Sequence, residues 1–196
     1  GYITAREALT YSKNLTSIKT VDMLGLDTAL NYGKKAGLKY APQSHTMSAL
    51  ALGQFDQPIG NRDGGNTTIL ASAYGAFGNN GVIYEPALYT KVEDASGNLL
   101  LEKEPISTKL FSPQTSYIIY DILKGSSTSA QFNDIPVAGK TGTTNSSDNF
   151  WFAGLTPYYS GSVWIGYDNP QRMNGKSSSA ASLFSKIMAV AHEGLE

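Results

Sequence analysis

The chain contains no cysteine, and this absence removes several kinds of chemistry at once. Disulfide bonds, thiolate metal sites and cysteine nucleophiles are all excluded. Histidine is nearly as scarce, because His45 and His192 are the only two and lie in unrelated contexts. With no G-x-S-x-G elbow and no H-E-x-x-H motif either, a Ser-His-Asp hydrolase or a His-ligated metal site lacks its parts.

Charge is also low and balanced. Charged residues make up 16% of the chain, with 15 Lys and Arg against 16 Asp and Glu. This balance disfavours a nucleic-acid partner, because such proteins need a basic excess. No apolar run approaches the roughly 18 to 20 residues of a transmembrane helix. What remains is 196 residues with 41% hydrophobic content, enough core-forming material for one globular domain.

Capping residues, helical periodicity and terminating glycines predict helices through the first two thirds of the chain. Thr4-Ala5-Arg6-Glu7 has the form of a capping box, and we expect Asn14 to cap the second helix. The predicted helices span residues 4–11, 15–24, 27–36, 68–77 and 112–123. The segment 42–65 is irregular, with a short helical turn possible at 48–52.

Strand patterns follow. Residues 82–92 and 99–102 predict a hairpin, and 136–144, 150–155 and 161–167 predict a three-stranded antiparallel meander. A closing helix is expected over 180–192, its apolar stripe lying against the sheet. That stripe comprises Leu183, Phe184, Ile187, Met188 and Ala191. Helices first and strands last indicate an α+β fold.

Lys140 is the strongest chemical candidate. Gly139-Lys140-Thr141 suggests a phosphate-binding loop, but the first glycine of that motif should stand where Asp134 is, and Pro136 interrupts the loop. A lysine-centred acyl-transfer site needs no histidine if its lysine lies in a cleft. Lys140 lies on a predicted strand among small residues that leave room for a ligand backbone.

The residues around Lys140 carry a family resemblance. Lys-Thr-Gly-Thr-Thr at 140–144 is followed by Phe-Trp-Phe-Ala-Gly-Leu-Thr-Pro at 150–157 and Val-Trp-Ile-Gly-Tyr at 163–167. In order and spacing these segments resemble the KTG strand and the next two strands of penicillin-binding protein transpeptidase domains. Ser12-Lys13-Asn14 resembles the S-x-N motif of the family. The similarity covers nearly the whole chain and is greatest to the bifunctional class A enzymes.

The resemblance implies a penicillin-binding/β-lactamase-like fold whose nucleophilic serine lies in an S-x-x-K tetrad. No lysine of this chain has a serine three positions before it. Because the family places the tetrad before S-x-N, we expect it upstream of Gly1, on a separate chain after proteolysis or on a lost segment. By this interpretation residues 1–196 are the C-terminal portion of one transpeptidase domain. Residues 1–135 would form its mostly helical part, and 136–196 the KTG strand, two further strands and the closing helix.

The implied activity is peptidoglycan cross-linking by serine acyl transfer between stem peptides, with β-lactam antibiotics acylating the same serine. Ser12 and Lys140 would relay a proton to the leaving amine, and the backbone N–H of Thr143 would be one of two oxyanion donors. The implied substrate-binding residues are Asn14, Thr141, Gly142 and Thr143. No metal or organic cofactor is expected. The parent protein is expected to be extracytoplasmic and anchored in the cell membrane by a segment outside this chain.

Two alternatives remain open at this point. A D,D-carboxypeptidase or β-lactamase of the same fold would resolve the acyl-enzyme with water instead of an amine. A non-catalytic domain that binds peptidoglycan or β-lactams would share the same motifs. The upstream sequence, which holds the nucleophile in this interpretation, would separate the second alternative from an enzyme.

Overall fold

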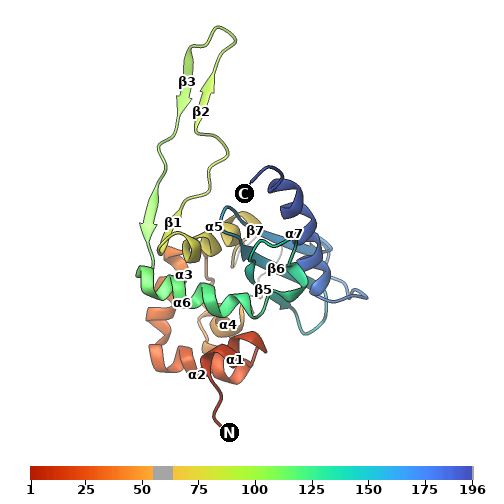
Figure 1. Cartoon of the computed structure of the whole chain (residues 1–196). Helices are drawn as coiled ribbons and strands as arrows, with labels where there is room; N and C mark the ends of the chain where they lie inside the picture. The colour runs from red at the N-terminus through yellow and green to blue at the C-terminus, as the bar shows by residue number, and fades with distance from the viewer. Residues whose placement is uncertain (55–63, 196) are drawn as a thin grey trace.

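The computed structural model describes residues 1–54 and 64–195 (Figure 1). The helices are α1 (Ala5–Thr10), α2 (Asn14–Leu24), α3 (Leu26–Lys35), α4 (Met47–Leu52), α5 (Thr67–Gly78), α6 (Pro113–Lys124) and α7 (Ser178–Ala191), with 3-10 turns at Pro42–Ser44 and Thr128–Ala130. The strands are β1 (Val82–Tyr84), β2 (Lys91–Glu93), β3 (Leu99–Glu102), β4 (Ser107–Lys109), β5 (Ala138–Thr143), β6 (Asn149–Leu155) and β7 (Ser160–Gly166). Within the described ranges, no helix is both long enough and apolar enough to cross a bilayer. Part of the predicted irregular segment 42–65 lies outside the described residues.

Side-chain caps explain where most of the helices begin. The Thr4 hydroxyl accepts from the Glu7 N–H, and the Glu7 carboxylate accepts from the Thr4 N–H, so the predicted capping box of α1 is confirmed. The Ser112 hydroxyl caps α6 by accepting from the Thr115 N–H at 3.1 Å. The predicted role of Asn14 as a cap is wrong, because Asn14 is the first helical residue of α2 and Lys13 occupies the cap position without a side-chain hydrogen bond.

The last third of the chain forms the predicted antiparallel meander. Its strand order is β5-β6-β7, and the register places Lys140 opposite Ala153 and Thr143 opposite Phe150. Helices α5 and α6 contact this sheet from one side and α7 from the other (Figure 1). Because side chains alternate across a strand, Lys140 shares a face with Ala138, and Ala138 packs against Leu123 of α6. Lys140 therefore lies on the face that the helical part of the chain covers.

The other face of the sheet carries the largest hydrophobic cluster. Phe152 of β6 and Phe184 of α7 are both fully buried, with ring centroids 4.9 Å apart. The predicted stripe of α7 is only partly right, because Leu183 is 42% and Ile187 52% exposed. Small side chains at Ala180 and Ala181 face the sheet instead. They let the helix approach closely, which rotates the larger aliphatic side chains of the neighbouring stripe toward solvent.

The predicted hairpin is interrupted. Residues 82–92 do not form one strand, because β1 pairs with β4 and β2 pairs with β3 as separate two-stranded ladders. Pro86 and Pro105 lie between the two ladders, and a proline has no N–H to donate to a ladder. In Figure 1 the β2–β3 arm projects away from the rest of the chain.

Candidate active site

Strand β5 brings four of the predicted site residues together at an edge of the sheet. Lys140, Thr141, Gly142 and Thr143 are consecutive on β5, whose only ladder partner in the described chain is β6. Just beyond the strand, the Thr144 N–H donates to the Asn149 carbonyl oxygen of β6. Backbone groups alternate between the two sides of an antiparallel strand, so the N–H groups of Thr141 and Thr143 point to the free edge. This edge therefore presents two outward-facing N–H groups along which a ligand backbone can align.

Lys140 places its charge at the same edge. Its side chain is half-buried, and its ammonium Nζ donates to the Thr141 carbonyl oxygen at 3.2 Å. Burial lowers the pKa of the Lys140 ammonium below its usual value, because the charged form loses solvation. A lysine in this setting releases a proton more readily than one in water. It can also attract an anionic group, since no carboxylate in the described part of the chain forms an ion pair with it.

Close packing confines the two glycines of β5 to different degrees. A Cβ at Gly139 would lie 2.5 Å from Cζ of Phe152 and 2.7 Å from the carbonyl oxygen of Ala153. Gly142 is less confined, because its nearest neighbour would be Cβ of Trp151 at 3.3 Å. Gly139 thus allows β5 and β6 to approach closely directly before Lys140. Gly142 leaves the backbone between the two threonines without a side chain.

A polar network that sequence reasoning missed orders the turn after Thr143. The Thr144 hydroxyl bonds the Asp148 carboxylate and also accepts from the Asp148 and Asn149 N–H groups. Hydrogen bonds to the Asp148 carboxyl lower its pKa, the one from the Thr144 hydroxyl most strongly, with smaller contributions from the Ser146 and Asn149 side chains. The Asn149 side-chain oxygen accepts from the Trp164 indole at 2.7 Å, which ties the turn to β7. The Asp148-Asn149 pair after a run of small polar residues is the one sequence signal that could have indicated such a turn.

The other two predicted residues lie at the junction of α1 and α2. Ser12 is exposed and has a left-handed backbone with a φ of 52°, which turns the chain between the helices. The Ser12 N–H donates to the Leu9 carbonyl oxygen at 3.2 Å, and the Lys13 N–H to that of Ala8 at 2.8 Å. Asn14 follows with an exposed side chain.

The structure does not join these two groups by a direct hydrogen bond. Within residues 1–54 and 64–195, no hydrogen bond connects Ser12 or Asn14 to the Lys140 side chain. Both groups instead adjoin α6, because α1 and β5 each contact this helix. The sequence motifs are therefore placed relative to one another through α6.

Comparison with known proteins identifies the family of this chain. The family described as "Penicillin binding protein transpeptidase domain" matches residues 1–189. The chain belongs to this family. Penicillin-binding protein 1A from Clostridium perfringens strain 13 is 52% identical over 203 residues, which cover 100% of this chain and 30% of that protein. Penicillin-binding protein 1A/1B from Bacillus subtilis is 33% identical over 220 residues, with 99% of this chain and 23% of that protein covered.

Solved structures show that the fold is that of penicillin-binding transpeptidases. The D,D-transpeptidase domain of a peptidoglycan glycosyltransferase from Eggerthella lenta has a TM-score of 0.75 at 22% identity, covering 100% of this chain and 55% of that one. Penicillin-binding protein 1A from Haemophilus influenzae also reaches 0.75, at 20% identity, covering 99% and 35%. This penicillin-binding transpeptidase chain spans less than a third of the length of its curated relatives.

Proposed function

We propose that this chain supplies part of a serine acyl-transfer site that cross-links peptidoglycan stem peptides and that β-lactams acylate. The observation that carries the proposal is the free edge of β5, where the half-buried Lys140 ammonium lies beside outward-facing N–H groups of Thr141 and Thr143. Such an edge can hold an extended peptide and a carboxylate together. A relative of the same fold, penicillin-binding protein A from Mycobacterium tuberculosis, is described as an imipenem acyl-enzyme complex, with a TM-score of 0.76.

The proposal gives each candidate residue a role, in keeping with the family resemblance. The Thr143 N–H supplies one oxyanion donor, because it points to the free edge; loss of a single donor typically costs about 10² to 10³ in rate. The Thr141 and Thr143 hydroxyls bind the terminal carboxylate, whose charge Lys140 offsets. Lys140 passes a proton to the leaving amine through the Ser12 hydroxyl, and its lowered pKa favours that transfer. Asn14 holds a substrate amide.

The nucleophile belongs to a part of the parent protein outside this chain. No serine precedes a lysine by three positions anywhere in the sequence, so no residue here fits the expected tetrad. In the described chain β7 pairs with β6 alone, and Leu183, Ile187 and Val190 of α7 are exposed. These uncovered surfaces support the interpretation of residues 1–196 as the C-terminal portion of one domain that further chain completes. Without that portion, this chain is inactive.

The test uses the full-length parent protein and a fluorescent penicillin. Lys140→Ala should acylate about 10² to 10⁴ times more slowly than the unmodified protein, because a proton relay is lost. Lys109→Ala is the matched control, because Lys109 is also a strand lysine whose ammonium donates to a carbonyl oxygen, that of Asn80 at 2.7 Å. Normal acylation of Lys140→Ala would remove Lys140 from the mechanism.

Peptide mapping by mass spectrometry then locates the adduct. The penicillin mass should appear on a serine in a peptide outside these 196 residues. An adduct within this chain would contradict the assignment of the nucleophile. Release of the cross-linked product on addition of an acceptor amine would distinguish transpeptidation from hydrolysis by water.

A further inference from the structure

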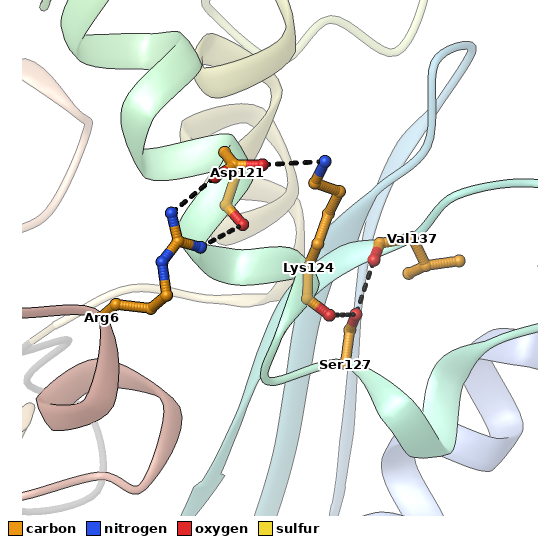
Figure 2. A network of polar contacts seen from close by, with 5 residues as sticks. All are labelled: Arg6, Asp121, Lys124, Ser127 and Val137. Carbon is orange, nitrogen blue, oxygen red and sulfur yellow. Dashed lines mark hydrogen bonds and ion pairs between the residues drawn. The ribbon is translucent and has the colours of Figure 1, made fainter.

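Polar contacts that no catalytic role explains join the elements that carry the two halves of the candidate site. One half, Ser12 with Asn14, follows α1; the other, Lys140 with its threonines, lies on β5. The contacts run from Arg6 of α1 through Asp121 and the last turn of α6 to the beginning of β5 (Figure 2).

The first contact, from Arg6, is made to α6 at two points. The Arg6 guanidinium donates from Nη2 to the Asp121 carboxylate at 2.6 Å and from Nη1 to the Asp121 carbonyl oxygen at 3.1 Å. Two donors of a rigid planar fork fix orientation as well as distance, which a single ammonium cannot do. The Lys124 ammonium lies 2.9 Å from the other carboxylate oxygen but makes no hydrogen bond or ion pair with α1 in the described chain (Figure 2). The two Arg6 contacts give α1 a two-point polar attachment to α6.

The second set of contacts anchors α6 to β5. The Ser126 hydroxyl lies 2.8 Å from the carbonyl oxygen of Gly139, the residue before Lys140. The Ser127 hydroxyl lies 3.0 Å from the Lys124 carbonyl oxygen and 2.5 Å from that of Val137 (Figure 2). The carbonyl groups of Val137 and Gly139 point to the free edge of β5, so these serines occupy the edge up to Lys140 and leave the part beyond it open.

The exposure of the ion pair argues against a mainly stabilising role. The Arg6 side chain is 54% exposed and that of Asp121 33%. Exposed ion pairs contribute little to stability, because water screens the charges and ordering long side chains costs entropy. The packing of α1 comes instead from apolar residues, with Ala8 buried and Leu9 against the cluster of Leu123. The contribution that remains for the ion pair is to orient α1 relative to α6.

We propose that Arg6 and Asp121 are positioning residues, which hold the loop of Ser12 and Asn14 at a fixed place relative to Lys140. The inference rests on the proposed function for its kinetic consequence. A small shift of α1 on α6 would move the Ser12 hydroxyl without unfolding the chain. Misplacement of a catalytic group by about 1 Å can cost roughly 10²-fold in rate.

The experiment compares Arg6→Ala, Arg6→Lys and Lys124→Gln in the full-length protein. Lys124→Gln is the matched control, because it removes a cation from the same carboxylate but leaves α1 anchored. Acylation by a fluorescent penicillin over a concentration series gives a limiting rate and a half-saturating concentration. Arg6→Ala should lower the limiting rate about ten- to a hundred-fold, with the half-saturating concentration and melting temperature little changed. Arg6→Lys should recover part of the rate, and Lys124→Gln should resemble the unmodified protein.

Hydrogen–deuterium exchange provides a readout that does not need activity. Peptides covering residues 8–14 should exchange faster in Arg6→Ala than in Lys124→Gln, because the loop is released. An Arg6→Ala protein with an unchanged limiting rate, or one whose rate falls only in step with its melting temperature, would overturn the proposal. If the unmodified protein takes no penicillin label, the proposed function fails, and unchanged exchange in Arg6→Ala would then overturn the positioning role separately.

Discussion

Replacing Ser12 by glycine should separate the stability of the α1–α2 junction from its chemistry. Ser12 has a left-handed backbone, with a φ of 52°. This conformation costs an L-residue roughly 1 to 2 kcal/mol. Glycine adopts it freely but loses about 0.5 to 1 kcal/mol more backbone entropy on folding. Ser12→Gly should therefore raise the free energy of unfolding by about 0 to 1.5 kcal/mol. Ser12→Ala keeps the strain and should change stability little, because the serine side chain is exposed.

Both variants lack the hydroxyl and should lose the same activity. Acylation of the full-length protein by a fluorescent penicillin should slow by about 10² to 10⁴-fold if Ser12 relays a proton. Urea unfolding of the same preparations gives the stability change, and the rate is measured at saturating penicillin so that weaker binding does not contribute. A more stable protein with a much slower limiting rate is the expected signature of Ser12→Gly.

Two results would refute this reasoning. If Ser12→Gly were acylated at the normal rate, the Ser12 hydroxyl would have no part in the relay. If Ser12→Gly were clearly less stable than Ser12→Ala, the left-handed backbone would not be a source of strain in the folded protein. Each result bears on a different step, since the first concerns the hydroxyl and the second the backbone.

Three further expectations concern β5 and the helices beside it. Gly139→Ala should destabilise by about 1 to 3 kcal/mol in urea unfolding, because its Cβ would lie 2.7 Å from the Ala153 carbonyl oxygen; Gly142→Ala, which has more room, should lose less, and equal losses would contradict the packing argument. Burial raises the pKa of Tyr74 to about 12, so the fold favours the neutral phenol and stability should fall as pH rises from about 10. Tyr74→Phe should show a smaller alkaline loss, and an equal loss would count against the burial argument. The pH profile of acylation should have an inflection below the usual lysine pKa, because burial lowers the pKa of Lys140; an inflection that persisted in Lys140→Arg would assign it to another group.

Local signals predicted most of the elements because their causes are local. The capping box at Thr4, the helix that begins at Ser112-Pro113 and the strand-forming segment of β6 all depend on residues close together in the chain. The prediction for Asn14 was wrong by one residue, because the left-handed turn at Ser12 places the extended cap conformation at Lys13, and Asn14 is already helical. The prediction of a single hairpin at 82–102 missed its division into two ladders. Pro86 and Pro105 interrupt the pairing at matching positions.

The candidate site also has features that the sequence predicted and features that it did not. The order of its motifs, the absence of a suitable nucleophile and the family were all readable from the sequence, because they depend on residue types and spacing. The contact between Arg6 and Asp121 was not, since the two residues are 115 positions apart and meet only when α1 packs on α6. The network of Asp148 and Asn149 was missed for a similar reason, because its link to Trp164 crosses strands.

By itself, then, the sequence determined the helices, the meander and the identity of the chemical groups at 140–143, all through local propensity and pattern. The tertiary structure alone decided which edge of β5 is open, which stripe of α7 is buried and that α1 and β5 both pack against α6. Those features arise from packing between elements distant in sequence. Close approach by small residues determines which face of a helix is buried, and two-point hydrogen bonding orients one helix on another; sequence periodicity specifies neither.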